Sequence, residues 1–189
     1  VEKLGMATVG QGKSVLDNHK MQIYLLYQTE WLATGSGYDD KIGALWVNPS
    51  TCKPVGSTIG HEIGHSFQYQ VSADKLFTGE ATPIDKADGS QLVPAGFRYG
   101  FGENGAGGCA YWEQCAQWQS FQDYPNECFD QDAHYAVWLK NHHRHFNHEF
   151  MRYASYWFQY WFTEKHGIDS YARIWKESKY PEDPLQTYM

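Results

Sequence analysis

The chain has 189 residues, a length typical of one domain with a substantial buried core. Its 15 basic and 22 acidic residues give a formal net charge of −7 without any cluster of Lys and Arg, which excludes a nucleic-acid-binding surface and a polybasic membrane anchor. Aromatic residues make up 17% of the chain, which excludes a disordered segment, and the most apolar uncharged run, 154–162, is too short to span a bilayer.

The two ends indicate a fragment of a longer protein. The chain begins at Val1, with neither an initiator Met nor a signal peptide. Asp183 and Pro184 predict a helix start only a few residues before the last residue. We therefore expect residues 1–189 to form a single domain of a longer chain. The four cysteines are too widely spaced for a CxxC motif, and they form either up to two disulfides or free buried thiols. They are Cys52, Cys109, Cys115 and Cys128.

Two strands are predicted first in chain order. Residues 21–27 and 42–47 are short apolar runs, and the turn formers in 34–40 separate them. A hairpin or a neighbouring pair is the simplest arrangement. After Pro54 the hydrophobic pattern becomes helical.

The motif HExxH occupies residues 61–65 of the helix that follows. On a helix His61 and His65 lie one turn apart, so that both imidazoles can reach one metal ion, and Glu62 can contact a water on that ion. Ser57 or Thr58 can cap the helix. An apolar stripe is predicted on the face opposite the histidines, at Ile59, Ile63 and Phe67. Gly60 and Gly64 predict that another segment packs tightly beside it.

The remainder of the chain is predicted to be mostly helical. A long stretch rich in Gly and Pro, 82–108, precedes helices at 110–123, 146–165 and 170–178. In the second helix a core stripe is expected at Phe150, Ala154, Trp157 and Trp161. Strands first and helices afterwards indicate an α+β domain.

A catalytic zinc ion needs a third protein ligand and an open position for water. The continuation HExxHxxGxxH fails, because Gln68 and Val71 stand where it needs Gly and His. Five later glutamates remain: Glu80, Glu103, Glu113, Glu127 and Glu149. Glu113 is favoured because it lies on a convincing helix, and Glu103 comes next. Gln117, one turn after Glu113, can hydrogen-bond a liganding histidine.

At these residues the chain resembles the gluzincin group of zinc metallopeptidases, through the motif at 61–65, Glu113 and the run 43–48. The resemblance implies a zincin-like fold, Zn²⁺ as cofactor, and hydrolysis of peptide bonds in a peptide, protein or glycoprotein substrate. It also implies that 43–48 is an edge strand that binds extended substrate around Ala44 and Trp46. Thermolysin-like members have Asn and Asp where this chain has Trp112 and Gln117. The whole chain is similar to an uncharacterised family of secreted bacterial zinc peptidases, which implies a secreted or periplasmic location.

Five histidines fall in one later region: His134, His142, His143, His145 and His148. They could bind a second metal, stabilise an oxyanion, or simply form a solvated polar stretch. Peptidases of this type need a phenol or imidazole near the scissile carbonyl, and we expect Tyr153, with His148 and Arg152 close by.

In the expected mechanism, Glu62 is the general base for a metal-activated water. Two other hypotheses stay open. One is a catalytically silent zincin-like module that binds glycan or protein, and the other is a structural zinc site with a fourth protein ligand.

Overall fold

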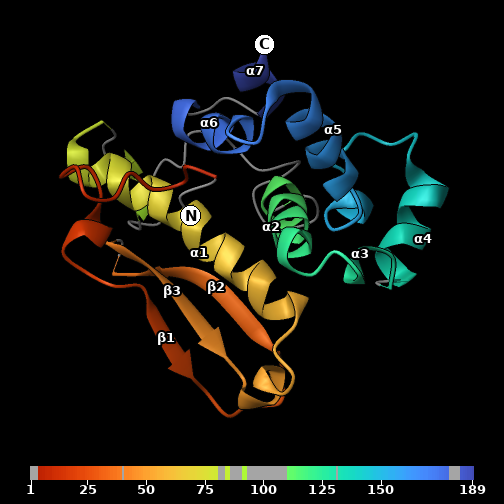
Figure 1. Cartoon of the computed structure of the whole chain (residues 1–189), viewed down its shortest axis with the longest axis horizontal. Helices are drawn as coiled ribbons and strands as arrows, with labels where there is room; N and C mark the ends of the chain where they lie inside the picture. Colours follow the sequence, from red (N-terminus) through yellow and green to blue (C-terminus); the bar gives the residue numbers. More distant parts are fainter. Residues whose placement is uncertain are drawn as a thin grey trace.

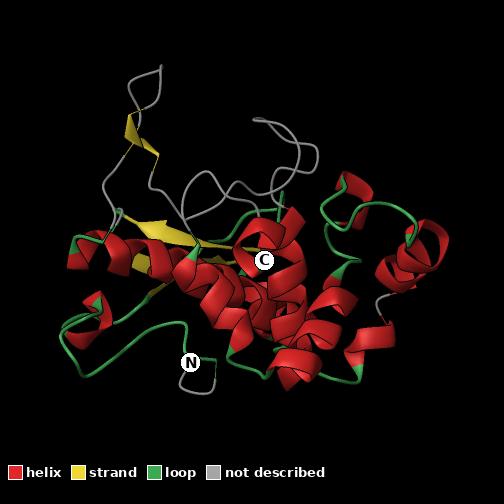
Figure 2. Cartoon of the chain, turned by 90° about the horizontal axis from the view of Figure 1, so that it is seen from above, coloured by secondary structure: helices red, strands yellow, loops and turns green. Residues whose placement is uncertain are grey.

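The structure, a computed structural model, describes residues 4–39, 41–80, 84–85, 91–92, 110–130, 132–178 and 184–189. The described part is α+β, with a three-stranded sheet followed by a mostly helical remainder. The long helix α1 (Ser57–Thr78) lies between the sheet and the other helices (Figure 1, Figure 2). A single helix therefore contacts both layers of the fold. A separate two-stranded pair consists of β4 (Ile84–Asp85) and β5 (Gln91–Leu92).

The three-stranded sheet contains β1 (Gln22–Leu25), β2 (Ala33–Tyr38) and β3 (Ile42–Val47), in the order β1-β3-β2. The central strand β3 pairs in parallel with β1 and antiparallel with β2. The two predicted strands are thus neighbours, as expected. They form no hairpin, because β2 lies between them in the sequence.

The prediction of a turn at 34–40 was wrong, since most of this segment is strand β2. Its glycines allow the strand to approach α1 closely. A Cβ atom at Gly35 would lie 1.9 Å from the backbone oxygen of Glu62, and one at Gly37 would lie 1.7 Å from the ring of Tyr69. Here glycine provides space for a packed helix and does not mark a change of chain direction.

Helix α1 differs from its prediction at its start and in its buried face. Its N-cap is Gly56, and the first backbone N–H, on Ser57, donates to Glu127 Oε2 at 3.2 Å. A distant carboxylate therefore replaces the predicted Ser or Thr cap. The predicted apolar stripe is only half-buried, whereas the buried side chains of α1 are mostly polar. The reason is that layers on both sides cover the helix, and the histidine face points between them.

Six further helices are described: α2 (Ala110–Asp123), α3 (Glu127–Asp130), α4 (Asp132–Asn141), α5 (Tyr156–His166), α6 (Ser170–Glu177) and α7 (Pro184–Tyr188). Two of the predictions, for α2 and α6, agree with the structure within one residue, and Pro184 does start a helix. Helices α3 and α4 were not predicted, nor were the short 3-10 turns η1 (Val15–Asp17), η2 (Pro49–Cys52) and η3 (Glu149–Met151).

The predicted helix at 146–165 begins only at Tyr156. The carbonyl oxygen of Phe146 accepts the hydroxyl of Ser155 at 2.8 Å and the amide of Gln114 at 3.4 Å, so side chains hold a loop there. The predicted core stripe is consequently wrong at Phe150 and Trp161, which are exposed. The buried aromatics of α5 are Tyr156 and Phe162.

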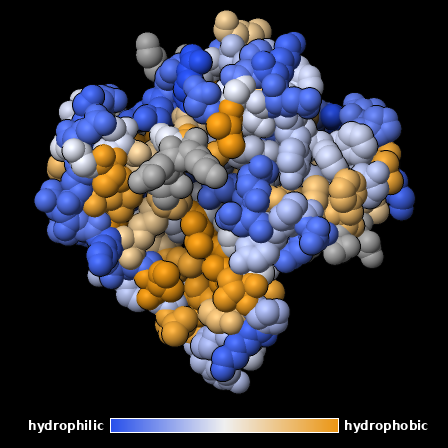
Figure 3. Space-filling model, viewed as in Figure 1, coloured by the Kyte–Doolittle hydropathy of each residue, from blue (hydrophilic) through white to orange (hydrophobic). Residues whose placement is uncertain are grey.

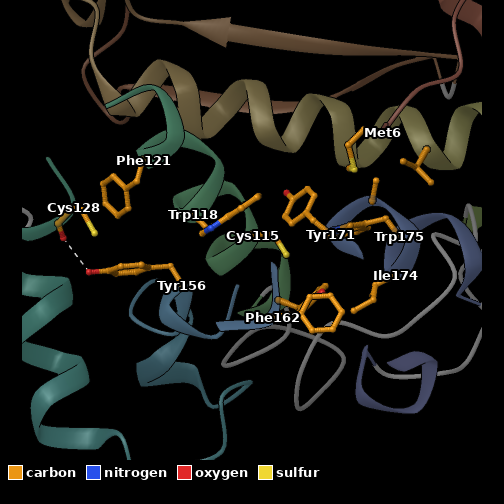
Figure 4. Close-up of a cluster of buried hydrophobic side chains, with 13 residues drawn as sticks. Met6, Cys115, Trp118, Phe121, Cys128, Tyr156, Phe162, Tyr171, Ile174 and Trp175 are labelled. Atoms are coloured by element: carbon orange, nitrogen blue, oxygen red, sulfur yellow. Dashed lines mark hydrogen bonds between the residues drawn. The ribbon is translucent and has the colours of Figure 1, made fainter. Parts of the chain in front are cut away.

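The main core lies among α2, α5 and α6 and is built of large aromatic side chains (Figure 4). Trp118 of α2 packs against Tyr171 of α6 with ring centroids 4.7 Å apart. The hydroxyl of Tyr156 donates to the backbone oxygen of Cys128 at 2.9 Å. The three cysteines in the described ranges, Cys52, Cys115 and Cys128, are free thiols, and Cys109 lies outside those ranges.

Candidate metal centre

The two histidines of α1 and the favoured glutamate of α2 meet at one point. Nε2 of His61 and Nε2 of His65 are 3.0 Å apart. Glu113 Oε2 lies 3.0 Å from the first of these atoms and 3.2 Å from the second. A tetrahedral zinc ion with bonds of about 2.0–2.1 Å separates its ligand atoms by roughly 3.3 Å. The three atoms therefore have the spacing of ligands around one ion.

Two glutamines fix the orientation of the imidazoles. Gln117 Oε1 lies 2.9 Å from His61 Nδ1, which is the contact predicted for Gln117. Gln68 Oε1 lies 2.9 Å from His65 Nδ1, and its Nε2 donates to the backbone oxygen of Trp112. Because amide oxygens only accept, both Nδ1 atoms carry a proton, and the Nε2 atom of each imidazole is the one that faces the other ligand atoms.

The electrostatics of this cluster favour a cation. A carboxylate oxygen and two imidazole lone pairs repel one another unless a positive charge lies between them. When a proton supplies that charge, His65 and Glu113 shift each other's pKa. Burial alone would lower the pKa of His65, but Glu113 outweighs it and raises that pKa. Burial alone would raise the pKa of Glu113, but hydrogen bonds from His61 and His65 hold it far below the usual range. A divalent ion satisfies all three atoms at once.

The tight packing predicted from the glycines of α1 is confirmed, and it holds α2 against the site. A Cβ atom at Gly64 would lie 3.1 Å from the Cα of Ala116, and one at Gly60 would lie 3.3 Å from the Cβ of Ser120. This close approach brings Glu113 within reach of α1.

Glu62 lies beside the three ligand atoms, on the side of the sheet. Its Oε2 accepts the backbone N–H of Gly35 at 2.6 Å. Burial raises the pKa of this carboxyl, although the charges of His61 and His65 partly oppose the shift. The contact from Gly35 was not foreseen. The alternation of glycines at 35 and 37 was its signal, because a period of two is typical of one face of a strand.

A pocket of about 180 Å³ opens over Glu62 and is lined from α1, α2, α4 and the loop before α5. Its lining residues are Ser57, Thr58, His61, Glu62, Gln117, His134 and Tyr153. The ring of Tyr153 lies 5.9 Å from that of His61 and stacks on that of His134 at 5.1 Å. Burial raises the pKa of Tyr153 to about 12 and lowers that of His134.

The structure brings Tyr153 to the site, as expected, but not His148. Arg152 does lie over the ring of Tyr153, at 5.0 Å. His148 instead contacts Arg144 at 3.1 Å and accepts the N–H of Phe150, because the turn at η3 directs it away from the pocket. Besides His61, the imidazole that lines the pocket is that of His134, on the helix α4 that the sequence did not reveal.

The predicted edge strand is also corrected. Ala44 is fully buried, and both it and Trp46 lie on β3, which is the central strand. The edge strand next to the site is β2, which supplies Gly35. The alternative third ligand Glu103 lies outside the described residues.

No other set of three or more His, Cys, Asp or Glu side chains in the described ranges has ligand geometry. The other histidines of the later region are therefore not brought together as a second metal site within those ranges. Every helix in the described ranges is too short or too polar to cross a membrane.

Comparison with known proteins identifies a family for this chain. No curated protein and no solved structure matches the chain. The match is to a family described only as one of unknown function, and it extends over residues 1–189. The chain therefore belongs to the Family of unknown function (DUF6055).

Proposed function

We propose that this chain is a zinc-dependent peptidase of the zincin type, with Zn²⁺ held by His61, His65 and Glu113. The observation that carries the proposal is the convergence of their three ligand atoms within 4.8 Å of one another. The described part of the chain offers three protein ligands here, which is typical of a catalytic zinc site, whereas a structural site has four. When bound, zinc lowers the pKa of water toward about 7 and polarises a carbonyl group.

Glu62 is the proposed general base. Its Oε2 is held by the backbone of Gly35 at 2.6 Å, so Oε1 remains to take the proton of the attacking water and pass it to the leaving amine. Tyr153 is the proposed electrophile. Burial raises its pKa to about 12, so its phenol stays protonated even in alkaline solution up to that range and can donate to the developing oxyanion. The neighbouring His134 orients this ring.

Substrate peptide is proposed to pair with β2 and not with β3. Among the described strands none pairs with the outer edge of β2, and the N–H of Gly35 on that edge donates to Glu62. An extended peptide that adds to this edge would pass over the pocket. The proposed substrate class is therefore a peptide, protein or glycoprotein segment in extended conformation.

The test combines metal analysis with digestion of a peptide library, with and without a chelator. We expect about one zinc per chain and cleavage that the chelator abolishes. Glu62→Gln should keep the zinc but lose activity by about 10²–10⁴-fold. Glu164→Gln, at an exposed glutamate on α5, is the matched control.

Bound zinc without chelator-sensitive cleavage would contradict the peptidase proposal and favour the silent binding module. Absence of stoichiometric zinc would contradict the metal site itself.

A further inference from the structure

The sheet edge opposite the site is exposed and apolar. Strand β1 forms this edge (Figure 1), and its Ile23 and Leu25 side chains are 66% and 64% exposed. Leu26 and Tyr27, which follow the strand, are exposed as well. Strongly apolar side chains gather over the sheet on the face that Figure 3 shows. A contiguous patch of this kind is typical of an interaction surface.

The backbone of β1 is ready to accept another strand. The N–H of Leu26 donates to Val47 O at 2.9 Å, so residues 22, 24 and 26 direct their backbone groups toward β3. Ile23 and Leu25 must then direct their N–H and C=O groups outward. In the described part of the chain, no strand pairs with this edge.

Strand β1 also lacks the usual devices that prevent edge-to-edge pairing. Residues 21–27 contain no charged residue, no Pro and no Gly. Natural edge strands commonly carry a Lys, a Pro or a bulge that blocks association.

We propose that β1 is the contact between two copies of this chain, which pair antiparallel about a two-fold axis at Tyr24. In this register Ile23 of each copy lies opposite Leu25 of the other copy, which gives two equivalent pairs. Both pairs have outward-facing backbone groups, so each forms two N–H···O=C bonds. The aliphatic side chains of both pairs lie on one face, and the two sheets become one continuous sheet.

Charge complementarity at the two ends of the strand supports a second copy as the occupant. The chain carries a net charge of −7, so copies repel one another over most of their surface, whereas this strand is neutral. Between residues 18 and 32 the only charged side chains are Lys20 and Glu30, at opposite ends of the strand. Antiparallel pairing brings the Lys20 end of each copy toward the Glu30 end of the other. The β2 edge beside Glu62 stays open.

The test is sedimentation of the chain from about 1 to about 200 μM, a range in which a small interface dissociates. We expect a reversible monomer–dimer equilibrium. The double variant Ile23→Lys/Leu25→Lys places like charges opposite each other and should stay monomeric throughout. Ile23→Lys/Leu25→Glu places opposite charges across the same register and should retain dimer. Leu139→Lys, at an exposed leucine of α4, is the control and should dimerise like the unmodified chain.

Amide hydrogen exchange gives a second readout that does not depend on the variants. Protection of the Ile23 and Leu25 amides should rise with protein concentration, while the Tyr24 amide stays protected at all concentrations. The proposal is overturned if the chain is monomeric throughout, if Ile23→Lys/Leu25→Lys still dimerises, or if Ile23→Lys/Leu25→Glu is as monomeric as the double lysine variant. Concentration-independent exchange at Ile23 and Leu25 would also overturn it.

Discussion

The contacts of α1 and the helical layer behind α2 are held together in different ways. The sheet and α2 approach α1 through glycines, so that backbone atoms lie near the helix at Gly35 and Gly64. The helical layer behind α2 is held by large aromatic rings, such as those of Trp118 and Tyr171. The proposed metal ligands lie in the first kind of contact.

The first kind of contact fixes the positions of the elements, and the second contributes mainly to stability. Where backbones approach closely, an added methyl group collides with atoms that cannot rotate away, so the position of each element is sharply fixed. In the aromatic core, each ring buries a large apolar area and contributes mainly to the free energy of unfolding. We therefore expect substitutions in the two regions to affect zinc binding and stability differently.

The largest effect is expected for Gly35→Ala. Its Cβ would lie 1.9 Å from the backbone oxygen of Glu62, which cannot move without shifting α1. The variant should lose about 4 kcal/mol of stability or fail to fold, and it should not bind zinc. Gly37→Ala is the comparison, because the atoms nearest to its Cβ belong to the half-buried side chain of Tyr69, which can rotate, and not to backbone. Thermal melts and metal analysis check both. Equal losses of stability and of zinc binding in the two variants would contradict the role given to the backbone contact at Gly35.

A substitution in the aromatic core should lower stability without weakening the site. Trp118→Ala removes a buried ring and should cost about 3–5 kcal/mol in denaturant unfolding. The molecules that remain folded should bind zinc with unchanged affinity. Trp161→Ala, at a partly exposed ring of α5, should change stability far less. If Trp118→Ala weakened zinc binding by the folded chain, the two regions would not be separable.

The glutamine that orients His65 should affect metal affinity more than stability. Gln68→Ala removes the acceptor of the Nδ1 proton and should weaken zinc binding by about 10–100-fold. Competition with a chelator of known affinity measures this change. Gln122→Ala, at an exposed glutamine of α2, is the control. Unchanged affinity in Gln68→Ala would show that Gln68 does not hold the imidazole.

The smallest effect concerns pH and the polar side chain of Asp74 on α1. Burial raises the pKa of this carboxyl above 3.8, although Gln70 and the N–H of Val15 donate to it. The folded state therefore binds its proton more tightly than the unfolded state, and the resulting stability is lost as the pH rises through the folded-state pKa.

Asp74→Asn keeps an acceptor oxygen but cannot ionise. Its stability relative to the unmodified chain should rise between about pH 4 and about pH 7, by less than about 1 kcal/mol after solvent screening. Urea unfolding at the two pH values checks this. A relative loss of stability over that interval would contradict the sign.

Part of the site could be predicted because its residues lie close to one another in the sequence. The spacing of His61 and His65 is set by one helical turn, and Gln117 follows Glu113 by one turn on another helix. These local relations appear unchanged in the structure. The meeting of Glu113 with the histidines was only favoured by elimination, because nothing in the sequence fixes how two helices cross.

The predictions that were wrong depended on contacts between distant segments. Strand β2 looked like a turn because its glycines are required by α1, not by local backbone geometry. The helix at 146 did not form because side chains, including Gln114 of α2, hold the loop. His148 was expected at the site because it is close to Tyr153 in the sequence, whereas His134 reaches the pocket on α4, a helix that the sequence did not reveal.

The sequence by itself determined the α+β order of elements, the motif on α1 and the pair of residues on α2, since each follows from a period of two or of 3.6 residues. Only the tertiary structure decided which strand lies at the edge, which histidine faces the pocket and how α1 is capped. Those features depend on atoms far apart in the chain that approach only after the layers pack, and local patterns carry no information about that approach.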